Sequence, residues 1–535
     1  MEQLLNRLLL PDTDLTSLLA LLVDEIRPAK AHDFETAKRN LQALCYLLGI
    51  HPELRSALRT AFNTLLRTHR HIELYTTTGI LPNTGFAPEG FRRIGHKLLP
   101  DVLDPGLLRS VLRRTFDRPS DRHWVIGVGD DAWLRLIEAI RFDEDPASEN
   151  FPHSLLELLR SLRVLSYGIA ACGMEPELLR LEPSLVTHES PFVAQNLEMA
   201  DYIEAYPGNW EKPHSEDGDD RHLRVLFSQC QEVIERVRRN AARNGTSIRL
   251  TYQLQRLRQL LRRSEHLLDI LAGLQGKKEE AAAYPPIVSL FTRLVSDECQ
   301  RNDLGRHWRQ NTELIALRVT DNASHHGEHY ITETRAEYWS MARSAMIGGV
   351  IIAGMACLKI LLTKAALPPL TGALAFCLNY GLGFCLIHIL HGTVATKQPA
   401  MTANAIAASL SYSGDRLRDI EALTDLIART CRSQIIAILG NVGVAIPLAG
   451  LLAFIIFSSS GEHFTSPEKS LHLLEEQSLL HSAAVFYAAI AGVCLFISGL
   501  ISGYYDNYAA YNRIPERILQ LNWPQRLFGA ARMRR

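Results

Sequence analysis

Three histidines and two carboxylates lie close together within residues 320–330, shortly before the first long apolar stretch of the chain. On a helix, His325 and His329 would lie four residues apart on one face, a spacing that allows two imidazoles to bind one metal ion. The zinc-protease pattern H-E-x-x-H is absent, and Gly327 weakens a helix at this point. The alternative is a capped turn that orients the following helix. We therefore expect neither a metal nor another cofactor, and His325 with His329 is the pair that could bind a metal.

Polar side chains inside long apolar stretches form a second set of candidate functional groups, because burying them in lipid is costly. They are Asn379, His388 and Asn441. Pro447 follows Asn441 closely and would kink a helix and release a backbone carbonyl. A broken helix lined by polar groups is typical of a transporter. Hydrogen bonding between neighbouring helices explains the same residues without transport, and both interpretations stay open.

Residues 221–263 contain eleven arginines and no lysine. Leucines recur there at helical spacing, which predicts two antiparallel helices that turn near Asn244-Gly245 and use the leucines as core. The arginines have three interpretations: a solvated face, a surface held against anionic lipid, or a nucleic-acid patch. Those that we expect to contact an anionic surface are Arg236, Arg238, Arg239, Arg243, Arg249, Arg256, Arg258, Arg262 and Arg263.

Four stretches are long and apolar enough to cross a bilayer, which requires about 20 residues in a helix. Glycines recur within them, which favours close packing of the helices and would also allow two copies of the chain to associate. The sequence therefore predicts a polytopic bundle of about four transmembrane helices, at residues 341–362, 370–390, 435–457 and 483–503.

Basic residues between the predicted spans give the expected orientation, because positively charged connections stay in the cytoplasm. The connection after the second span and the tail after the fourth carry eleven lysines and arginines, whereas the other two connections carry only Lys364 and Lys469. Both termini and the long region before the first span are therefore expected in the cytoplasm. The N-terminus also lacks the basic and apolar regions of a cleavable signal peptide.

The region before the spans has the 3.6-residue period of amphipathic helices, so we expect an all-α protein with a large soluble N-terminal part. An acidic, proline-containing stretch indicates a linker within it. The predicted organisation is a cytoplasmic helical domain at 1–206, an acidic linker at 207–220, an arginine-rich helical region leading to the membrane at 221–340, transmembrane helices within 341–505, and a basic cytoplasmic tail at 506–535.

Composition and missing motifs exclude several function classes. The net charge of −1 lacks the basic excess of a dedicated nucleic-acid binder. No two of the nine cysteines have C-x-x-C spacing, which excludes zinc-ribbon and thioredoxin-like sites. Residues 76–85 are rich in threonine and glycine but lack the phosphate-binding pattern G-x-x-x-x-G-K-[ST], so we interpret them as a plain loop.

Four stretches resemble a bacterial membrane-protein family described as site-specific recombinase, of the gonococcal-recombinase type. They are residues 73–81, Glu189-Ser190-Pro191-Phe192, residues 327–332 and Gly440-Asn441-Val442-Gly443, and the likeness extends over most of the chain. Members look like membrane proteins with a long soluble N-terminal region, which implies the bacterial cytoplasmic (inner) membrane. They typically continue with more apolar segments, so this chain is expected to be a shortened member.

The family description implies exchange of DNA strands, and the sequence can be searched for that chemistry. A tyrosine recombinase needs a histidine in H-x-x-R, which is absent, since His222-Leu223-Arg224 and His307-Trp308-Arg309 are one residue short. A serine recombinase begins with a strand-rich catalytic domain, whereas this N-terminus has a helical pattern. With no catalytic constellation, the expected function is binding or scaffolding at the membrane, with lipids and cytoplasmic proteins as partners. The alternatives are a recombinase or DNA-binding protein, and a transporter; nucleic-acid binding and self-association stay open.

Overall fold

The fold is all-α, as predicted. The computed structural model describes residues 1–10, 14–99, 102–142, 153–209, 220–274, 280–328, 331–332, 334–365, 367–395 and 416–529. In these ranges the regular elements are α-helices, and the β-type pairing amounts to one isolated bridge between Arg70 and Leu107. The chain divides into two compact units, Met1–Leu314 and Ile315–Arg535, which we call unit 1 and unit 2.

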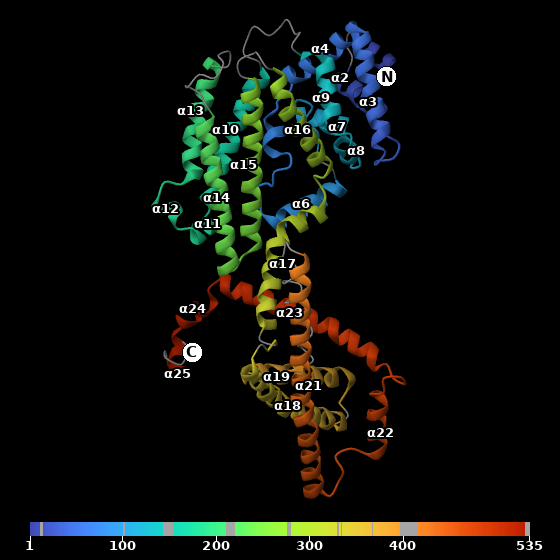
Figure 1. The fold of residues 1–535 in the computed structure, drawn as a ribbon, viewed down its shortest axis with the longest axis vertical. Coiled ribbons are helices and arrows are strands. Elements are labelled where there is room, and N and C mark those ends of the chain that lie inside the picture. The colour runs from blue at the N-terminus through green and yellow to red at the C-terminus, as the bar shows by residue number, and fades with distance from the viewer. Residues whose placement is uncertain are drawn as a thin grey trace. The chain divides into compact units, whose positions relative to one another are not determined.

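Unit 1 combines short helices with several long ones, most of which are labelled in Figure 1. Several begin at side-chain caps that the sequence provides; Asp14, for example, accepts hydrogen bonds from the backbone N–H groups of Thr16 and Ser17 at 3.1 and 3.4 Å. The helices are α1 (Glu2–Arg7), α2 (Leu15–Ile26), α3 (Phe34–Ile50), α4 (Pro52–Thr68), α5 (Ile72–Thr77), α6 (Phe86–Leu98), α7 (Leu108–Thr115), α8 (Asp121–Gly127), α9 (Asp130–Ile140), α10 (His153–Gly173), α11 (Pro176–Leu181), α12 (Ser184–Thr187), α13 (Pro191–Asn209), α14 (Arg221–Asn244), α15 (Ile248–Leu274) and α16 (Glu280–Cys299). The division between the units falls within α17 (Leu304–Glu328).

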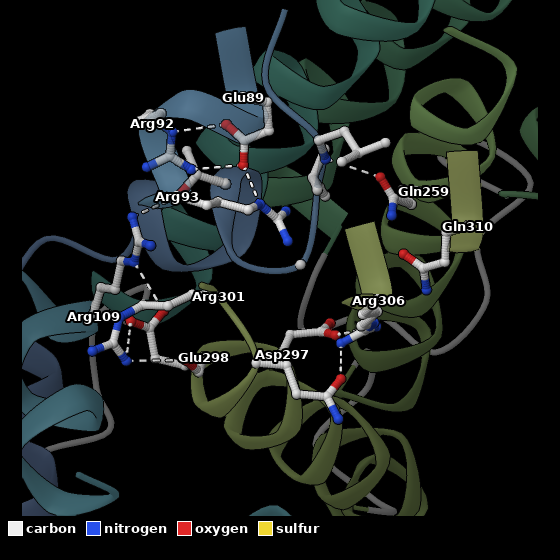
Figure 2. A pocket seen from close by; sticks show the side chains of 15 residues that line it. Glu89, Arg92, Arg93, Arg109, Gln259, Asp297, Glu298, Arg301, Arg306 and Gln310 are labelled. Atoms are coloured by element: carbon white, nitrogen blue, oxygen red, sulfur yellow. Dashed lines mark hydrogen bonds and ion pairs between the residues drawn. The ribbon is translucent and has the colours of Figure 1, made fainter. Parts of the chain in front are cut away.

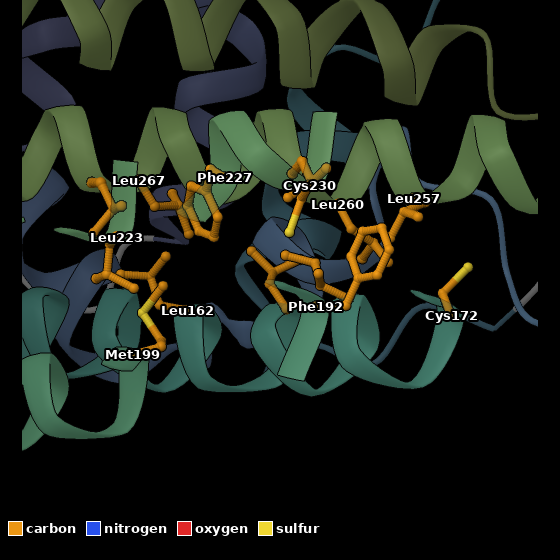
Figure 3. Close-up of a cluster of buried hydrophobic side chains, with 14 of the residues drawn as sticks. Leu162, Cys172, Phe192, Met199, Leu223, Phe227, Cys230, Leu257, Leu260 and Leu267 are labelled. Atoms are coloured by element: carbon orange, nitrogen blue, oxygen red, sulfur yellow. The ribbon is translucent and has the colours of Figure 1, made fainter. Parts of the chain in front are cut away.

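One hydrophobic core of unit 1 is built mainly from the long helices α10, α13, α14 and α15. Figure 3 shows side chains from these helices filling the space between them, with Phe192 and Phe227 among the largest. The leucine stripe predicted as core is buried along α15, from Leu250 to Leu271. Removing these apolar surfaces from water is the main favourable term in holding the long helices together.

A second core joins α1–α4 with α7–α9 around Trp124 and Trp133. Helix α16 contributes to both cores: Leu290 and Leu294 lie in the first, while Val288 and Val295 lie in the second. The two cores therefore belong to one body with α16 between them.

The predicted linker at 207–220 lies mostly outside the described residues, which omit 210–219. Helices on both sides of it, α13 and α14, contact each other and share the first core. Both belong to the same compact unit, and the division that the contacts give is at residue 314.

Among its described residues, unit 2 contains four helices that are long and apolar enough to cross a membrane, in agreement with the four predicted spans. They lie in α18 (Arg335–Lys364), α19 (Pro369–Ile389), α21 (Arg416–Ser460) and α23 (Ala484–Tyr511). The short helices α22 (Pro467–Glu476), α24 (Ile514–Leu519) and α25 (Asn522–Phe528) complete the unit. The buried share of the most apolar window falls from 33% in α18 to 6% in α23, so most of their apolar side chains face outward.

Helices α18 and α21 run parallel and cross closely. Gly440 packs where an added Cβ would lie 2.6 Å from the Cβ of Ala345, and Gly349 packs against the backbone oxygen of Asn441. Farther along both helices, Lys364 Nζ lies 3.5 Å from the carbonyl oxygen of His463. Helix α19 runs antiparallel to α18, because Asn379 donates a hydrogen bond to the carbonyl of Met355 while Gly392 approaches Gly348. Small residues at the crossing allow the close backbone approach that membrane helices use.

Candidate functional site

A polar pocket of about 70 Å³ lies within unit 1 and is lined by five arginines. Figure 2 shows its labelled side chains, with Arg109 and Arg301 on one side of the opening and Gln259 and Gln310 on the other. The charged lining residues are Arg92, Arg93, Arg109, Arg301 and Arg306, opposed by Glu89, Asp297 and Glu298. These residues come from α6, α7, the region from α16 to α17, and α17 itself, so tertiary packing brings them together.

Residues 76–85, predicted to be a plain loop, contribute Thr77 and residues 79–81 to one wall of this pocket, and side chains of α15 hold this segment. Arg263 donates hydrogen bonds to the carbonyl oxygens of Tyr75 and Thr78 at 3.1 and 2.9 Å. Gln259 accepts a hydrogen bond from the N–H of Leu81 at 2.9 Å. Because α5 ends at Thr77, these bonds satisfy backbone groups that a helix end and a turn leave without partners.

Gly79 at the tip of the loop has a φ of +77°, a conformation that favours glycine. A Cβ at this position would lie 2.0 Å from Oδ2 of Asp297. The loop backbone therefore lies directly against the carboxylate that α16 presents, and only glycine fits there without displacing Asp297.

Each carboxylate of the pocket is already paired with arginine. Glu89 is fully buried and accepts hydrogen bonds from Arg92 at 2.7 and 2.8 Å and from Arg93 at 2.6 Å. Burial alone would raise the pKa of Glu89, but these hydrogen bonds hold it below its usual range. Asp297 accepts from Arg306 at 3.0 Å.

The other buried carboxylate, Glu298, lies among three arginines. Nε of Arg109 donates to it at 3.2 Å, while Arg113 and Arg301 lie 3.9 and 3.5 Å from its Oε1. Arg301 also donates to the Glu298 carbonyl at 3.1 Å, but its buried Nε has no hydrogen-bond partner. Burial lowers the pKa of Arg301 and the cations Arg113 and Arg109 lower it further, against the attraction of Glu298. Positive charge is therefore undercompensated on this side of the pocket.

The arginines of residues 221–263, which we call the hairpin arginines, do not form one continuous cationic surface. Arg263 is buried beneath the loop, and Arg258 is ion-paired with Glu235, while Arg249 lies 3.5 Å from both Glu175 and Glu177. Of the remaining predicted residues, Arg236, Arg239 and Arg262 are exposed, Arg238 and Arg256 are half-buried, and the side chain of Arg243 lies outside the described part of the structure.

The polar residues predicted inside the membrane are not brought into one site. Asn441 donates to the carbonyls of Ala345 and Thr393 at 2.6 and 2.9 Å and accepts from the N–H of Ala395 at 2.8 Å. Asn379 instead bonds to Met355, ten residues farther along α18, and His388 is exposed. The two asparagines thus tie backbone segments together, and α21 continues through Pro447 without a break.

The proposed metal pair cannot be assessed as a pair, since His329 lies outside the described residues. His325 lies in α17, which continues through Gly327 to Glu328, and its side chain is likewise outside the description. The predicted capped turn follows at Thr334, which forms a capping box with Glu337 at the start of α18. Within the described residues, no group of three His, Cys, Asp or Glu could hold a metal ion.

A family model described as site-specific recombinase matches residues 13–535. The chain belongs to this family. Comparison with curated proteins and with solved structures finds no significant match. In this site-specific recombinase family member, three of the stretches that carry the resemblance can be placed. Thr77 and residues 79–81 line the pocket, Phe192 lies in the first core, and Gly440 with Asn441 lies at the crossing of α18 and α21.

The tyrosines near the pocket of this site-specific recombinase family member are not activated as nucleophiles. Burial raises the pKa of Tyr75 to about 12 and that of Tyr252 to about 12. The Tyr252 hydroxyl donates to the carbonyl of Pro82 at 2.8 Å, which gives it a structural role. Both phenols are therefore protonated at neutral pH, whereas a nucleophile needs a lowered pKa or an adjacent base.

Sequence reasoning missed the five pocket arginines. One signal was present, because Arg92 and Arg93 follow Glu89 by three and four residues and so lie on the same helix face. Arg109 is far in sequence from Arg301 and Arg306, and only the packing of α7 against α16 brings it close to them.

Proposed function

We propose that this protein is a multi-pass protein of the bacterial cytoplasmic membrane in which unit 1 is a cytoplasmic binding body and not a catalyst. The observation that carries the proposal is the exposure of apolar side chains along α19, α21 and α23, such as Leu382, Phe454 and Phe486. Water would disfavour such surfaces strongly, whereas lipid accepts them. Helix α23, with 28 residues, extends about 42 Å and exceeds the roughly 30 Å bilayer core.

The parallel arrangement of α18 and α21 supports four alternating crossings. Two parallel spans need one antiparallel span between them, and α19 has that direction relative to α18. Because basic connections stay on the cytoplasmic side, we propose that both termini are cytoplasmic.

The binding role rests on unit 1, whose exposed Arg236, Arg239 and Arg262 could contact the anionic inner leaflet. Each such contact contributes about 1 kcal/mol near an anionic membrane surface. Because other hairpin arginines are ion-paired within the fold, we expect this attraction to be moderate and to weaken with salt.

Two measurements test the proposal. The full chain should remain with the membrane pellet after alkaline carbonate extraction, and its recovery in the aqueous fraction would contradict membrane insertion. Residues 1–314, which contain both hydrophobic cores, should float with vesicles containing phosphatidylglycerol and not with phosphatidylcholine alone. Replacing Arg236, Arg239 and Arg262 together by Gln should abolish flotation. Glu232→Gln, at an exposed position of α14, should increase it.

DNA is the second candidate partner because the family description names recombination. The same exposed arginines could neutralise DNA phosphates, and such binding falls steeply with salt. Duplex DNA that displaces unit 1 from vesicles at low salt would favour this candidate. Failure of residues 1–314 to bind duplex DNA at low salt would exclude it for unit 1.

A further inference from the structure

We infer that the arginine-lined pocket of unit 1 binds a small phosphate-type oxyanion, either inorganic phosphate or the phosphate end of a monoester. None of the exposed arginines of the membrane proposal lines this site, so the inference does not depend on that proposal. The inference rests on the charge, the unused donors and the size of the pocket.

The charge of the lining favours a dianion. Five arginines face three carboxylates, which leaves an excess of two positive charges in a partly enclosed space. Charge in such a space is screened less than on an open surface, so an uncompensated excess is unfavourable until an anion enters. A phosphate monoester carries about this opposite charge at neutral pH.

The donors needed for an oxyanion are present around the opening. Nε of Arg301 is buried without a partner. Arg306 and Arg109 each donate only some of their guanidinium N–H groups to carboxylates. Gln310 adds a neutral amide on the opposite side of the opening (Figure 2). Arginine and amide N–H groups from several directions match the tetrahedral oxygens of phosphate.

The size of the pocket limits the ligand. Its volume of about 70 Å³ has room for several water molecules, since one needs roughly 10–15 Å³ of such space. Organic ligands of drug size need about 300 Å³ or more, so only a small ionic group enters the pocket. A duplex backbone or a lipid surface is therefore a poor fit, whereas the end of a soluble monoester can insert.

The loop wall adds a means of selection. Gly79 lies against Asp297, and α15 fixes residues 75–81 through Arg263 and Gln259. The wall is thus rigid on the side where Asp297 would repel an anion that lies off centre. We expect the bound oxyanion to lie toward Arg301 and Gln310, away from this carboxylate.

Calorimetric titration of the full chain in neutral detergent tests the inference. Inorganic phosphate and phenyl phosphate are the soluble probes, phosphatidic acid in mixed micelles is the lipid probe, and chloride at matched ionic strength is the control. We expect saturable binding of a soluble probe and no response to chloride. Binding of phosphatidic acid alone would identify a headgroup as the source of the phosphate, which supports the same chemistry.

Two variants locate the site. Gln310→Glu preserves shape but places a carboxylate at the opening, and we expect it to weaken phosphate binding by about tenfold or more. Gln229→Glu makes the same chemical change at an exposed position of α14 and should leave phosphate binding unchanged. Arg301→Gln, which removes the charge but keeps a donor, should also weaken binding and guards against misfolding of one variant. Absence of phosphate binding by the wild type, or equal binding by Gln310→Glu and the wild type, would overturn the inference.

Discussion

Arg263 and Thr78, 185 residues apart in sequence, are joined by a hydrogen bond of 2.9 Å from the buried guanidinium to the backbone carbonyl. The same guanidinium donates to the carbonyl of Tyr75 at 3.1 Å. Burial lowers the pKa of Arg263 to about 10, yet the side chain stays protonated at neutral pH. One buried cation on α15 therefore fixes the loop that forms the pocket wall.

Arg263→Met should release this loop. The substitution leaves two backbone carbonyls without their donor, at a cost of about 1–3 kcal/mol for each buried unsatisfied group. Amide hydrogen exchange of residues 75–81 should become faster, while that of α3 in the second core should change little. Arg262→Met on the exposed neighbouring position is the control. Equal exchange in the two variants would show that Arg263 does not hold the loop.

Gly440→Ala should weaken the crossing of α18 and α21. Its new Cβ would lie 2.6 Å from the Cβ of Ala345 and 3.3 Å from the carbonyl oxygen of Ala342. Such overpacking destabilises a fold by roughly 1–3 kcal/mol. Gly443→Ala is the matched control, since nothing lies within 4 Å of its added Cβ. The proteins are unfolded with dodecyl sulfate in mixed micelles, and loss of helix is followed by circular dichroism. Gly440→Ala should unfold at a lower dodecyl sulfate concentration than the wild type, and Gly443→Ala should not. Identical midpoints would argue against the close crossing.

Asp121→Asn should destabilise unit 1. The buried Asp121 carboxylate accepts from Arg27 at 2.7 and 2.8 Å and from the indole N–H of Trp124 at 2.9 Å. Asparagine removes the buried charge opposite Arg27 and weakens these hydrogen bonds. Because Arg27 keeps its ion pairs with Asp24 and Asp117, we expect a cost of about 1–3 kcal/mol. Hydrogen exchange in α8 and α2 should accelerate markedly. Asp117→Asn removes a more exposed partner of the same Arg27 and should have a much smaller effect.

Acidification below pH 6.5 should reduce the stability of unit 1. Burial lowers the pKa of His307 and that of His71 below the ordinary value of 6.5. Between the lowered folded pKa and 6.5, the unfolded chain binds more protons than the folded one, so stability is lost as pH falls through this window.

The variant His307→Gln separates this effect from other titrations. Nε2 of His307 lies 3.0 Å from the carbonyl of Phe86, and glutamine can supply a donor there without titrating. The loss of hydrogen-exchange protection in α6 between pH 7 and pH 5.5 should be smaller in this variant than in the wild type. An unchanged pH dependence would show that protonation of His307 does not cause the loss of stability.

The all-α class and the four membrane-capable helices could be predicted because both depend on local pattern. Leucines such as Leu257 and Leu261 repeat at helical spacing, and the uncharged stretch at 483–503 is readable from composition alone. The extent of α21 could not be read in this way, since its polar first half continues as one helix into the apolar half. That both sides of residues 207–220 belong to one unit likewise depends on tertiary contacts, those between α13 and α14.

The pocket could not be predicted because its lining comes from segments far apart in sequence, such as Glu89 to Arg93 and Asp297 to Gln310. The arginine density of residues 221–263 suggested a surface, yet Arg263 is buried and Arg258 is paired. Sequence patterns show which residues share a helix face but not which face another helix covers. Residues 76–85 lack a known phosphate-binding motif, so their sequence does not indicate that Gly79 and Ile80 line a pocket.

Reporter fusions in living bacteria test the central claim, the membrane path of unit 2, most directly. Alkaline phosphatase is active only outside the cytoplasm, and green fluorescent protein folds inside it. Phosphatase inserted after Gln477, between α22 and α23, should be active, whereas phosphatase after Phe528 should be inactive and green fluorescent protein there should fluoresce. Active phosphatase after Phe528, or none after Gln477, would contradict the proposed crossings and the cytoplasmic position of the termini.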